Sequence, residues 1–210
     1  MARHYIVWLL LLICIRALAD GYMIYPHGVN KPGVYIPNMQ PVLPTYATQP
    51  YTPSPQNIAL LTELRPFISQ IRIEEFISGL PDNKVVTCRS NVPIFTWDKS
   101  SYDAFMTAAL RADLHRAGVY NEDEGILING HIDRIDINSV GKGSWIIEGS
   151  FSGANGEPIH IKYEYSFETS LSATAACSAA SYAFVPALRG FFYAFYHDPG
   201  FKALASPAAQ

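Results

Sequence analysis

The fold is decided by residues 125–167, which read GILINGHIDRIDINSVGKGSWIIEGSFSGANGEPIHIKYEYSF. In residues 159–167 every second residue is isoleucine, tyrosine or phenylalanine, and the residues between them are polar. Residues 145–151 place tryptophan, isoleucine, glycine and phenylalanine on one face in the same way. Residues 141–144 and the pair Asn155-Gly156 have the composition of hairpin turns. The stretch therefore predicts a three-stranded antiparallel meander with one buried face and one wet face.

The first strand of this meander, residues 125–138, changes phase along its length. Ile126, Ile128 and Ile132 share one face, whereas Ile135 and Ile137 fall on the other face under strict alternation. A strand whose apolar residues are all to face one core needs an extra residue where the phase changes. We therefore predict a β-bulge near Asp133 or Arg134.

Two longer helices flank the meander. Residues 102–117 keep apolar residues at helical spacing, with Ser100 or Ser101 as N-cap and Gly118 as the stop. Residues 173–197 carry a stripe of alanine, leucine and phenylalanine, divided by Pro186 into a kinked helix or two helices.

Shorter elements precede these helices. The pattern indicates a short helix over residues 58–64, a strand within residues 68–77 and a second strand over residues 85–88. The resulting order is β-β-α-β-β-β-α, which is typical of the α+β class. We expect a small, mostly antiparallel sheet with the two main helices packed on one face.

Length and composition restrict the function classes. The chain has 210 residues, of which 49% are hydrophobic and 16% charged, with a formal net charge of −3. This is enough apolar material for one packed domain with tails. An acidic balance excludes a broad phosphate-binding surface, so we expect no nucleic-acid partner.

The first residues are predicted to direct export. Arg3 and His4 precede an apolar run that ends near Ile15, and Ala17-Leu18-Ala19 is a small-residue cleavage signal. Residues 1–19 are therefore predicted to be a signal peptide, and an uncleaved membrane anchor is the alternative. Cys14 raises the further alternative of lipidation, although Ile13 is not the small residue that a lipobox places before its cysteine.

Residues 20–56 form a predicted extended linker that contains eight of the chain's 15 prolines. Prolines at this spacing prevent a helix and a central strand, so the segment is predicted to be partly polyproline II. The α+β domain is predicted over residues 57–203, and residues 204–210 are predicted to be a flexible tail. The linker is also rich in tyrosine, which leaves open a spacer or a segment that orders on a partner.

After cleavage the chain would keep two cysteines, Cys88 and Cys177. Two thiols in an exported protein predict one disulfide, and two buried free thiols are the alternative.

Candidate partner-binding residues are aromatic. Tyrosines of the linker could anchor it on a partner, and the aromatic final helix could expose a patch to a partner or a membrane surface. These candidates are Tyr35, Tyr46, Tyr51, Phe192, Tyr193 and Tyr196.

Catalytic chemistry has one weak candidate. His131 and Asp133 lie two residues apart on one strand, where a metal site or an acid–base pair is geometrically possible. A wet strand face explains the same pair equally well. We predict no catalytic, cofactor-binding or metal-binding residues, and no cofactor.

Several motifs resemble an uncharacterised group of exported proteobacterial proteins, over about residues 85–201. They include Thr87-Cys88-Arg89, residues 101–120, residues 143–147, residues 153–156, residues 165–170, Ala176-Cys177, residues 183–188 and residues 197–201. The matched stretches include both cysteines, which supports their pairing. The element order also resembles transport-auxiliary lipoproteins, the lipopolysaccharide-assembly lipoprotein and the TolB amino-terminal domain, which act by binding partners.

These observations predict a non-catalytic protein of a Gram-negative cell envelope, periplasmic or associated with the outer membrane. It would bind an envelope protein as an accessory or component of a transport or secretion assembly. Membrane association through an N-terminal anchor or the terminal aromatic residues is a further possibility, and the oligomeric state stays open. The alternative is a periplasmic enzyme or small-ligand-binding protein with a site around His131 and Asp133.

Overall fold

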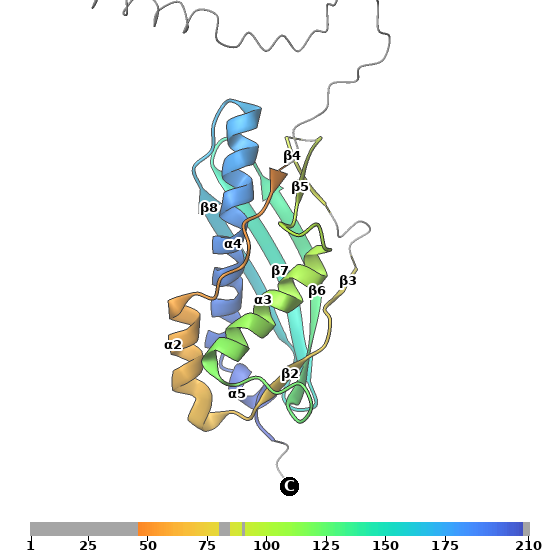
Figure 1. The fold of residues 1–210 in the computed structure, drawn as a ribbon, viewed down its shortest axis with the longest axis vertical. Coiled ribbons are helices and arrows are strands. Elements are labelled where there is room, and N and C mark those ends of the chain that lie inside the picture. Colours follow the sequence, from red (N-terminus) through yellow and green to blue (C-terminus); the bar gives the residue numbers. More distant parts are fainter. Residues whose placement is uncertain (1–45, 80–84, 90, 208–210) are drawn as a thin grey trace, which may run out of the picture. The chain divides into compact units, whose positions relative to one another are not determined.

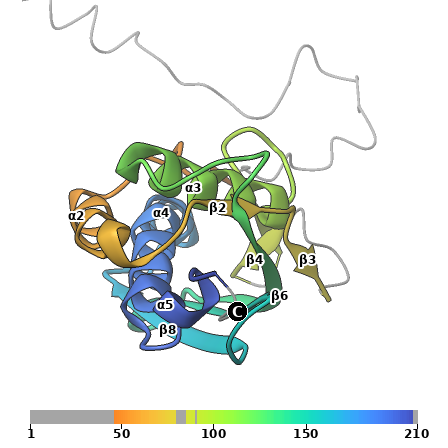
Figure 2. The same ribbon diagram turned by 90° about the horizontal axis from the view of Figure 1, so that it is seen from below.

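Five strands form the main sheet of this computed structural model, which describes residues 46–79, 85–89 and 91–207. The predicted meander is confirmed: strands β6 (Ile126–Asn138), β7 (Gly143–Gly153) and β8 (Ile159–Phe167) are antiparallel neighbours. Strands β2 (Ile71–Ile73) and β3 (Ile77–Ser78) both pair in parallel with β6. The strand order β2-β6-β7-β8 makes β8 an edge strand (Figures 1 and 2).

The predicted bulge is present in β6. The register between β6 and β7 shifts between Ile132 and Arg134, so that Ile128, Ile132 and Ile135 all point into the core. Asp133 is the residue that the shift leaves without an opposite partner on β7. The phase change in the sequence is therefore absorbed by one extra residue.

A second, smaller sheet was not predicted. Strand β4 (Val86–Cys88) pairs antiparallel with β5 (Val92–Phe95), and β1 (Tyr46–Ala47) pairs in parallel with β5. Of the early strands, β2 and β3 thus extend the main sheet beside β6, whereas β4 joins β5 and β1 in the separate sheet. The α+β class is as predicted; both sheets are mixed, and the long pairings of β7 with β6 and β8 are the antiparallel ones that the pattern predicts.

The helices are α2 (Pro55–Leu64), α3 (Tyr102–Ala117), α4 (Ala173–His197) and α5 (Phe201–Leu204), with a 3-10 turn at Arg65–Phe67. Helix α3 begins at the Ser101 cap, whose side chain accepts from the Ala104 N–H, and it ends at Gly118 with φ of +71°. Helix α4 continues through Pro186 as one helix.

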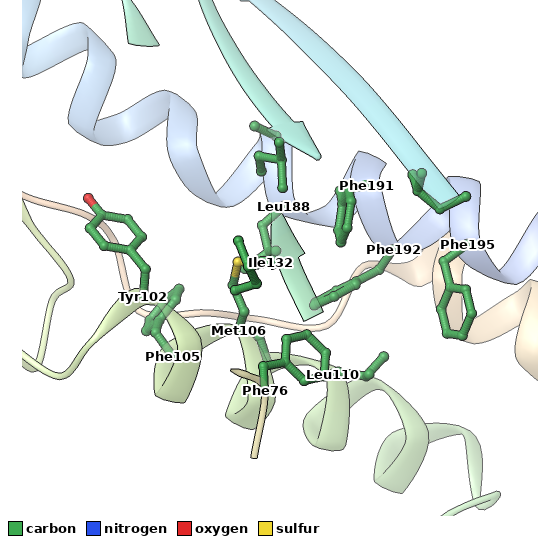
Figure 3. Packing of buried hydrophobic residues seen from close by; sticks show 14 of the residues in the cluster. Phe76, Tyr102, Phe105, Met106, Leu110, Ile132, Leu188, Phe191, Phe192 and Phe195 are labelled. Atoms are coloured by element: carbon green, nitrogen blue, oxygen red, sulfur yellow. The ribbon is translucent and has the colours of Figure 1, made fainter. Parts of the chain in front are cut away.

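The core lies between α3, α4 and the inner face of the main sheet. Helix α4 packs on β7 and β8, and α2 packs against both α3 and α4. Figure 3 shows Phe105, Met106 and Leu110 of α3 directed toward Leu188 and Phe192 of α4. The helices cover one face of the main sheet, as expected (Figure 2). The polar residues of β8 alternate with its buried and half-buried ones and therefore lie on the other face.

The folded unit begins earlier and ends later than the predicted domain. Residues 46–54 run over the domain: the Thr48 N–H donates to the Phe95 carbonyl at 2.8 Å, and α2 begins at Pro55 with Ser54 as its cap. Prolines tolerate this path because β1 is a two-residue edge strand and Pro55 stands in the first turn of a helix. At the other end, Leu204 and Ala205 are fully buried. The linker therefore ends before Tyr46 rather than at residue 56, and the first residues of the predicted tail belong to the core.

Candidate functional site

The disulfide lies at one end of the molecule, where the two sheets approach the start of α4. Cys88 ends β4 and Cys177 lies in the second turn of α4, with their Cα atoms 5.7 Å apart. Both side chains are fully buried. The predicted pairing is confirmed, and it attaches the smaller sheet to the helix that covers the main sheet.

Arg89 connects two loops beside this disulfide. Its backbone N–H donates to Ser139 Oγ at 3.2 Å, and its guanidinium donates to the Ser170 carbonyl. The Thr169 hydroxyl also donates to the Ser139 carbonyl, at 3.3 Å. The turn between β6 and β7 is thereby tied to the loop between β8 and α4. Arg89 adopts a positive φ of 50°, a conformation that a non-glycine residue keeps only where its surroundings hold it.

Each of the tied loops presents one large aliphatic side chain to solvent. Val140 is 63% exposed and follows Ser139, and Leu171 is fully exposed and follows Ser170. Exposed aliphatic side chains on fixed loops lose little conformational freedom on docking, which favours a contact surface. We call Val140, Leu171 and the loops that carry them the clamped end.

Sequence reasoning missed the clamped end. Val140 stands among asparagine, serine and glycine in a hairpin turn, and Leu171 stands between two serines. A large aliphatic residue inside turn chemistry is the signal that could have drawn attention to both.

The predicted patch on α4 is wrong for Phe192 and Tyr196, because both side chains are buried. The reason is that α4 is enclosed on more than one side, by the sheet and by α2. Phe192 packs edge-on to Tyr51 with ring centroids 6.3 Å apart. Tyr193 is half-buried and stacks on His197, so its role in partner binding stays a prediction.

The linker tyrosines have different outcomes. Tyr51 is held inside its own chain, because its hydroxyl donates to Asp113 Oδ1 at 2.9 Å. Tyr46 is half-buried in β1. A segment that orders through a tyrosine anchor is thus present, but for Tyr51 the surface that receives it is the protein's own domain. Tyr35, the signal peptide and most of the linker lie outside the described residues.

Asp113 is the centre of a buried polar cluster. Its Oδ2 atom accepts from Asn57 Nδ2 at 2.9 Å and from the Tyr196 hydroxyl at 3.1 Å, beside the Tyr51 bond to Oδ1. Burial raises the pKa of the Asp113 carboxyl more than these three hydrogen bonds and the nearby Arg189 charge lower it. Burial and the Asp113 charge likewise raise the pKa of the Tyr51 and Tyr196 hydroxyls. The cluster joins the segment before α2 to α2, α3 and α4, and its hydrogen bonds therefore have a structural role.

A shallow groove of about 370 Å³ runs beside this cluster along α4. Its lining includes Arg189, Gly190 and Tyr193 of α4 and Tyr163 of the edge strand β8. Arg189 is anchored by its Nε atom, which donates to the Thr52 carbonyl at 2.8 Å. The groove thus lies between the start of α2, helix α4 and Tyr163 of β8.

His131 and Asp133 do meet on β6. The two side chains are hydrogen-bonded, with 2.9 Å between His131 Nδ1 and Asp133 Oδ1, and each is 45% exposed. The pair lies on the open strand surface, where water screens both groups. Nothing in this geometry distinguishes a reactive pair from a surface ion pair.

The described residues contain neither a cluster of metal ligands nor a membrane-spanning helix. No three histidine, cysteine or acidic side chains in that part of the chain lie close enough together to hold a metal ion. Among the helices of the described ranges, none is both long and apolar enough to cross a bilayer.

Comparison with known proteins gives distant structural similarity. No protein-family model matches the chain, and no curated protein is similar to it. The chain is similar to the crystal structure of protein XCC0632 from Xanthomonas campestris, described under the family DUF330, with 10% identity and a TM-score of 0.48 over 73% of this chain and 95% of that one. It is also similar to a crystal structure of an uncharacterised protein, with 9% identity and a TM-score of 0.37 over 70% of this chain and 98% of that one. The candidate site therefore has to be argued from its own residues.

Proposed function

We propose that this protein is a non-catalytic component of the bacterial cell envelope that docks on a partner protein through its clamped end. The observation that carries the proposal is the pair of exposed aliphatic side chains, Val140 and Leu171, on loops tied by Arg89 and flanked by a disulfide. In the setting of an envelope transport or secretion assembly, the protein would act as an accessory or a structural component.

The disulfide supports an exported location. Stable disulfides form in oxidising compartments, such as the periplasm, and are rare where thioredoxin and glutathione keep thiols reduced. The Cys88–Cys177 bond is buried and closes a separation of 89 residues, which suits a structural role better than a redox role. A periplasmic or outer-membrane-associated protein is the location that we propose.

The test is site-specific photo-cross-linking in intact cells of the native host. A photo-reactive amino acid replaces Leu171 in the full-length chain, and in a matched control it replaces Ile77, which is 69% exposed on β3. We expect one discrete adduct with an envelope protein from position 171 and none from position 77. Adding Val140→Ser should reduce the adduct from position 171 severalfold, while the total amount of the protein stays the same.

The alternative function makes the opposite prediction. If His131 and Asp133 form a reactive pair, the double variant His131→Ala/Asp133→Ala fails to restore function to a strain from which the gene has been deleted. The double variant Val140→Ser/Leu171→Ser restores function as well as the wild type does. That pattern, or the lack of any adduct from position 171, would contradict docking through the clamped end.

A further inference from the structure

The outer edge of β8 is open, and its sequence is complementary to itself. All nine residues of β8 pair with β7 on one side, and no described strand pairs with the other side. An edge of this length presents a row of backbone N–H and C=O groups that another strand can pair with. The inference below rests on the backbone and charges of this edge and not on Val140 or Leu171, so it does not depend on the proposed function.

We propose that two copies of this chain pair antiparallel along β8, with a two-fold axis at Tyr163. A two-fold axis perpendicular to the sheet keeps the helices of both copies on the same face. Residues that stand directly opposite each other in an antiparallel pair have their side chains on the same face of the sheet. An axis between two neighbouring residues would place residues of opposite faces against each other, so the axis has to pass through one residue position. Only the central positions 162, 163 and 164 let seven or more of the nine residues of β8 pair.

The charges on the wet face select the centre. With the axis at Lys162 or at Glu164, that residue would face its own copy, and like charges directly opposite each other are unfavourable. With the axis at Tyr163, Lys162 of each copy faces Glu164 of the other. The same register pairs all nine residues of β8, and it is the one that the charge pattern permits.

A row of alternating charges crosses the wet face of the sheet and ends at Lys162 on β8, which has no opposite charge from the described residues on its outer side. Glu148 on β7 contacts Arg134 of β6 at 3.5 Å and Lys162 of β8 at 2.9 Å. Glu164 stands opposite Ile146 and forms no ion pair with the described residues of its own chain. In the proposed dimer the second copy's Glu164 extends the row Arg134, Glu148, Lys162 by one more opposite charge.

The other face of β8 supplies the apolar part of the interface. Tyr163, Tyr165 and Phe167 point toward the helix side and are only half-buried, because the sheet ends beside them. The proposed register places Tyr165 opposite Ile161 of the second copy and Phe167 opposite Ile159, which covers both aromatic rings.

Charge reversal tests the register directly. Lys162→Glu gives a chain with two acidic residues at these positions, and Glu164→Lys gives a chain with two basic residues. Each variant alone faces like charges at both contacts, so its dimer dissociation constant should rise about tenfold or more. Mixed in equal amounts, the two variants place opposite charges at both contacts, and a heterodimer should form.

The measurement is sedimentation velocity on the purified full-length protein over a range of concentrations, with one variant fluorescently labelled in the mixture. Glu157→Lys is the matched control, since it makes the same charge change at an exposed position before β8 and should leave the dimer unchanged. Circular dichroism melts establish that every variant is folded.

Three results would overturn the proposal. The first is a wild-type protein that stays monomeric at every concentration. The second is a dimer that Glu164→Lys weakens no more than Glu157→Lys does. The third is a mixture of the two reversed variants in which no heterodimer forms, although both variants are folded. A β8 edge that pairs with a strand of a different protein would give the first of these results.

Discussion

Asp113 shows how one side chain fixes the start of the folded unit. Its carboxyl is completely buried, and it accepts hydrogen bonds from three side chains that come from three different parts of the chain. Because burial disfavours the charged form, the pKa of Asp113 lies above its usual value of 3.8. A raised pKa in the folded state has a definite consequence for stability as a function of pH.

The stability of the wild-type protein should fall relative to Asp113→Asn as the pH rises above about 4. Below this pH the carboxyl is protonated in both states, so its contribution is fully present. As the pH rises toward the raised folded pKa, the unfolded chain releases its proton first, and the free energy of unfolding decreases by up to about 1.4 kcal/mol per pH unit. Urea denaturation of both proteins at a series of pH values measures the difference.

Asp98 provides a comparison of opposite sign. Burial raises the pKa of the Asp98 carboxyl, but hydrogen bonds, first of all those from the Ser100 side chain and backbone, together outweigh burial and lower the pKa below 3.8. The wild type should therefore lose stability relative to Asp98→Asn as the pH falls below about 4. The difference in unfolding free energy between the wild type and Asp113→Asn could instead be independent of pH, or change with pH in the same direction as for Asp98→Asn. Either result would mean that the folded protein does not raise the pKa of Asp113.

At the scale of elements, the contact between α4 and β8 depends on a missing side chain. A Cβ atom added at Gly190 would lie 2.1 Å from the Tyr163 hydroxyl oxygen, so the tyrosine ring occupies the space above the glycine. The same arrangement recurs within the sheet, where the Phe76 ring lies over Gly130 and the Phe167 ring over Gly143. At Gly130 and Gly143 of the sheet, a neighbouring aromatic ring thus packs over the glycine and occupies the space that a side chain would otherwise fill.

Gly190→Ala should destabilise the protein by about 1–3 kcal/mol, because the new methyl group forces the Tyr163 ring out of its place. In a Tyr163→Ala background the sign should reverse. The obstacle is then gone, and alanine is the better helix former by about 0.5–1 kcal/mol. Chemical denaturation of the four members of this double-mutant cycle gives both values. A destabilisation by Gly190→Ala that is equal in both backgrounds would mean that some other contact is responsible.

Features of the fold that depend on neighbouring residues could be predicted from the sequence, and features that depend on distant residues could not. The limits of α3 could be predicted, because Ser101 and Gly118 act within a few residues of themselves. The bulge in β6 could be predicted as well, since a phase change in the pattern requires it. The parallel pairing of β1 with β5 could not be predicted, and neither could the hydrogen bond from Tyr51 to Asp113 across 62 residues. Both join distant parts of the chain, and no pattern in the neighbouring residues indicates them.

The candidate site divides in the same way. The disulfide could be predicted from the cysteine count and the export signal. The burial of Phe192 and Tyr196 could not, because the stripe on α4 gives the direction of one face and not the number of elements that enclose the helix. The exposure of Val140 and Leu171 depends on loops whose path is set by Arg89, far away in sequence.

At the scale of the whole molecule, the disulfide joins the smaller sheet to helix α4. The smaller sheet β1-β5-β4 and the helix that covers the main sheet are joined there by a covalent bond with a sequence separation of 89 residues. Constraining so long a segment in the unfolded chain contributes about 4–5 kcal/mol in the chain-entropy model, which is an upper value. The non-covalent core around Phe184 and Trp145 contributes independently, since those side chains are fully buried.

Removing the disulfide should therefore weaken the protein without unfolding it. We expect the double variant Cys88→Ala/Cys177→Ala to lose about 2–4 kcal/mol in the free energy of unfolding, with the native far-UV circular dichroism spectrum retained. Adding a reductant to the wild type should lower its Tm toward that of the variant, and the same reductant should have no effect on the variant. Calorimetry with and without reductant measures both. An unchanged Tm on complete reduction, with free thiols confirmed by mass spectrometry after alkylation, would mean that the packing around α4 alone holds the two sheets together.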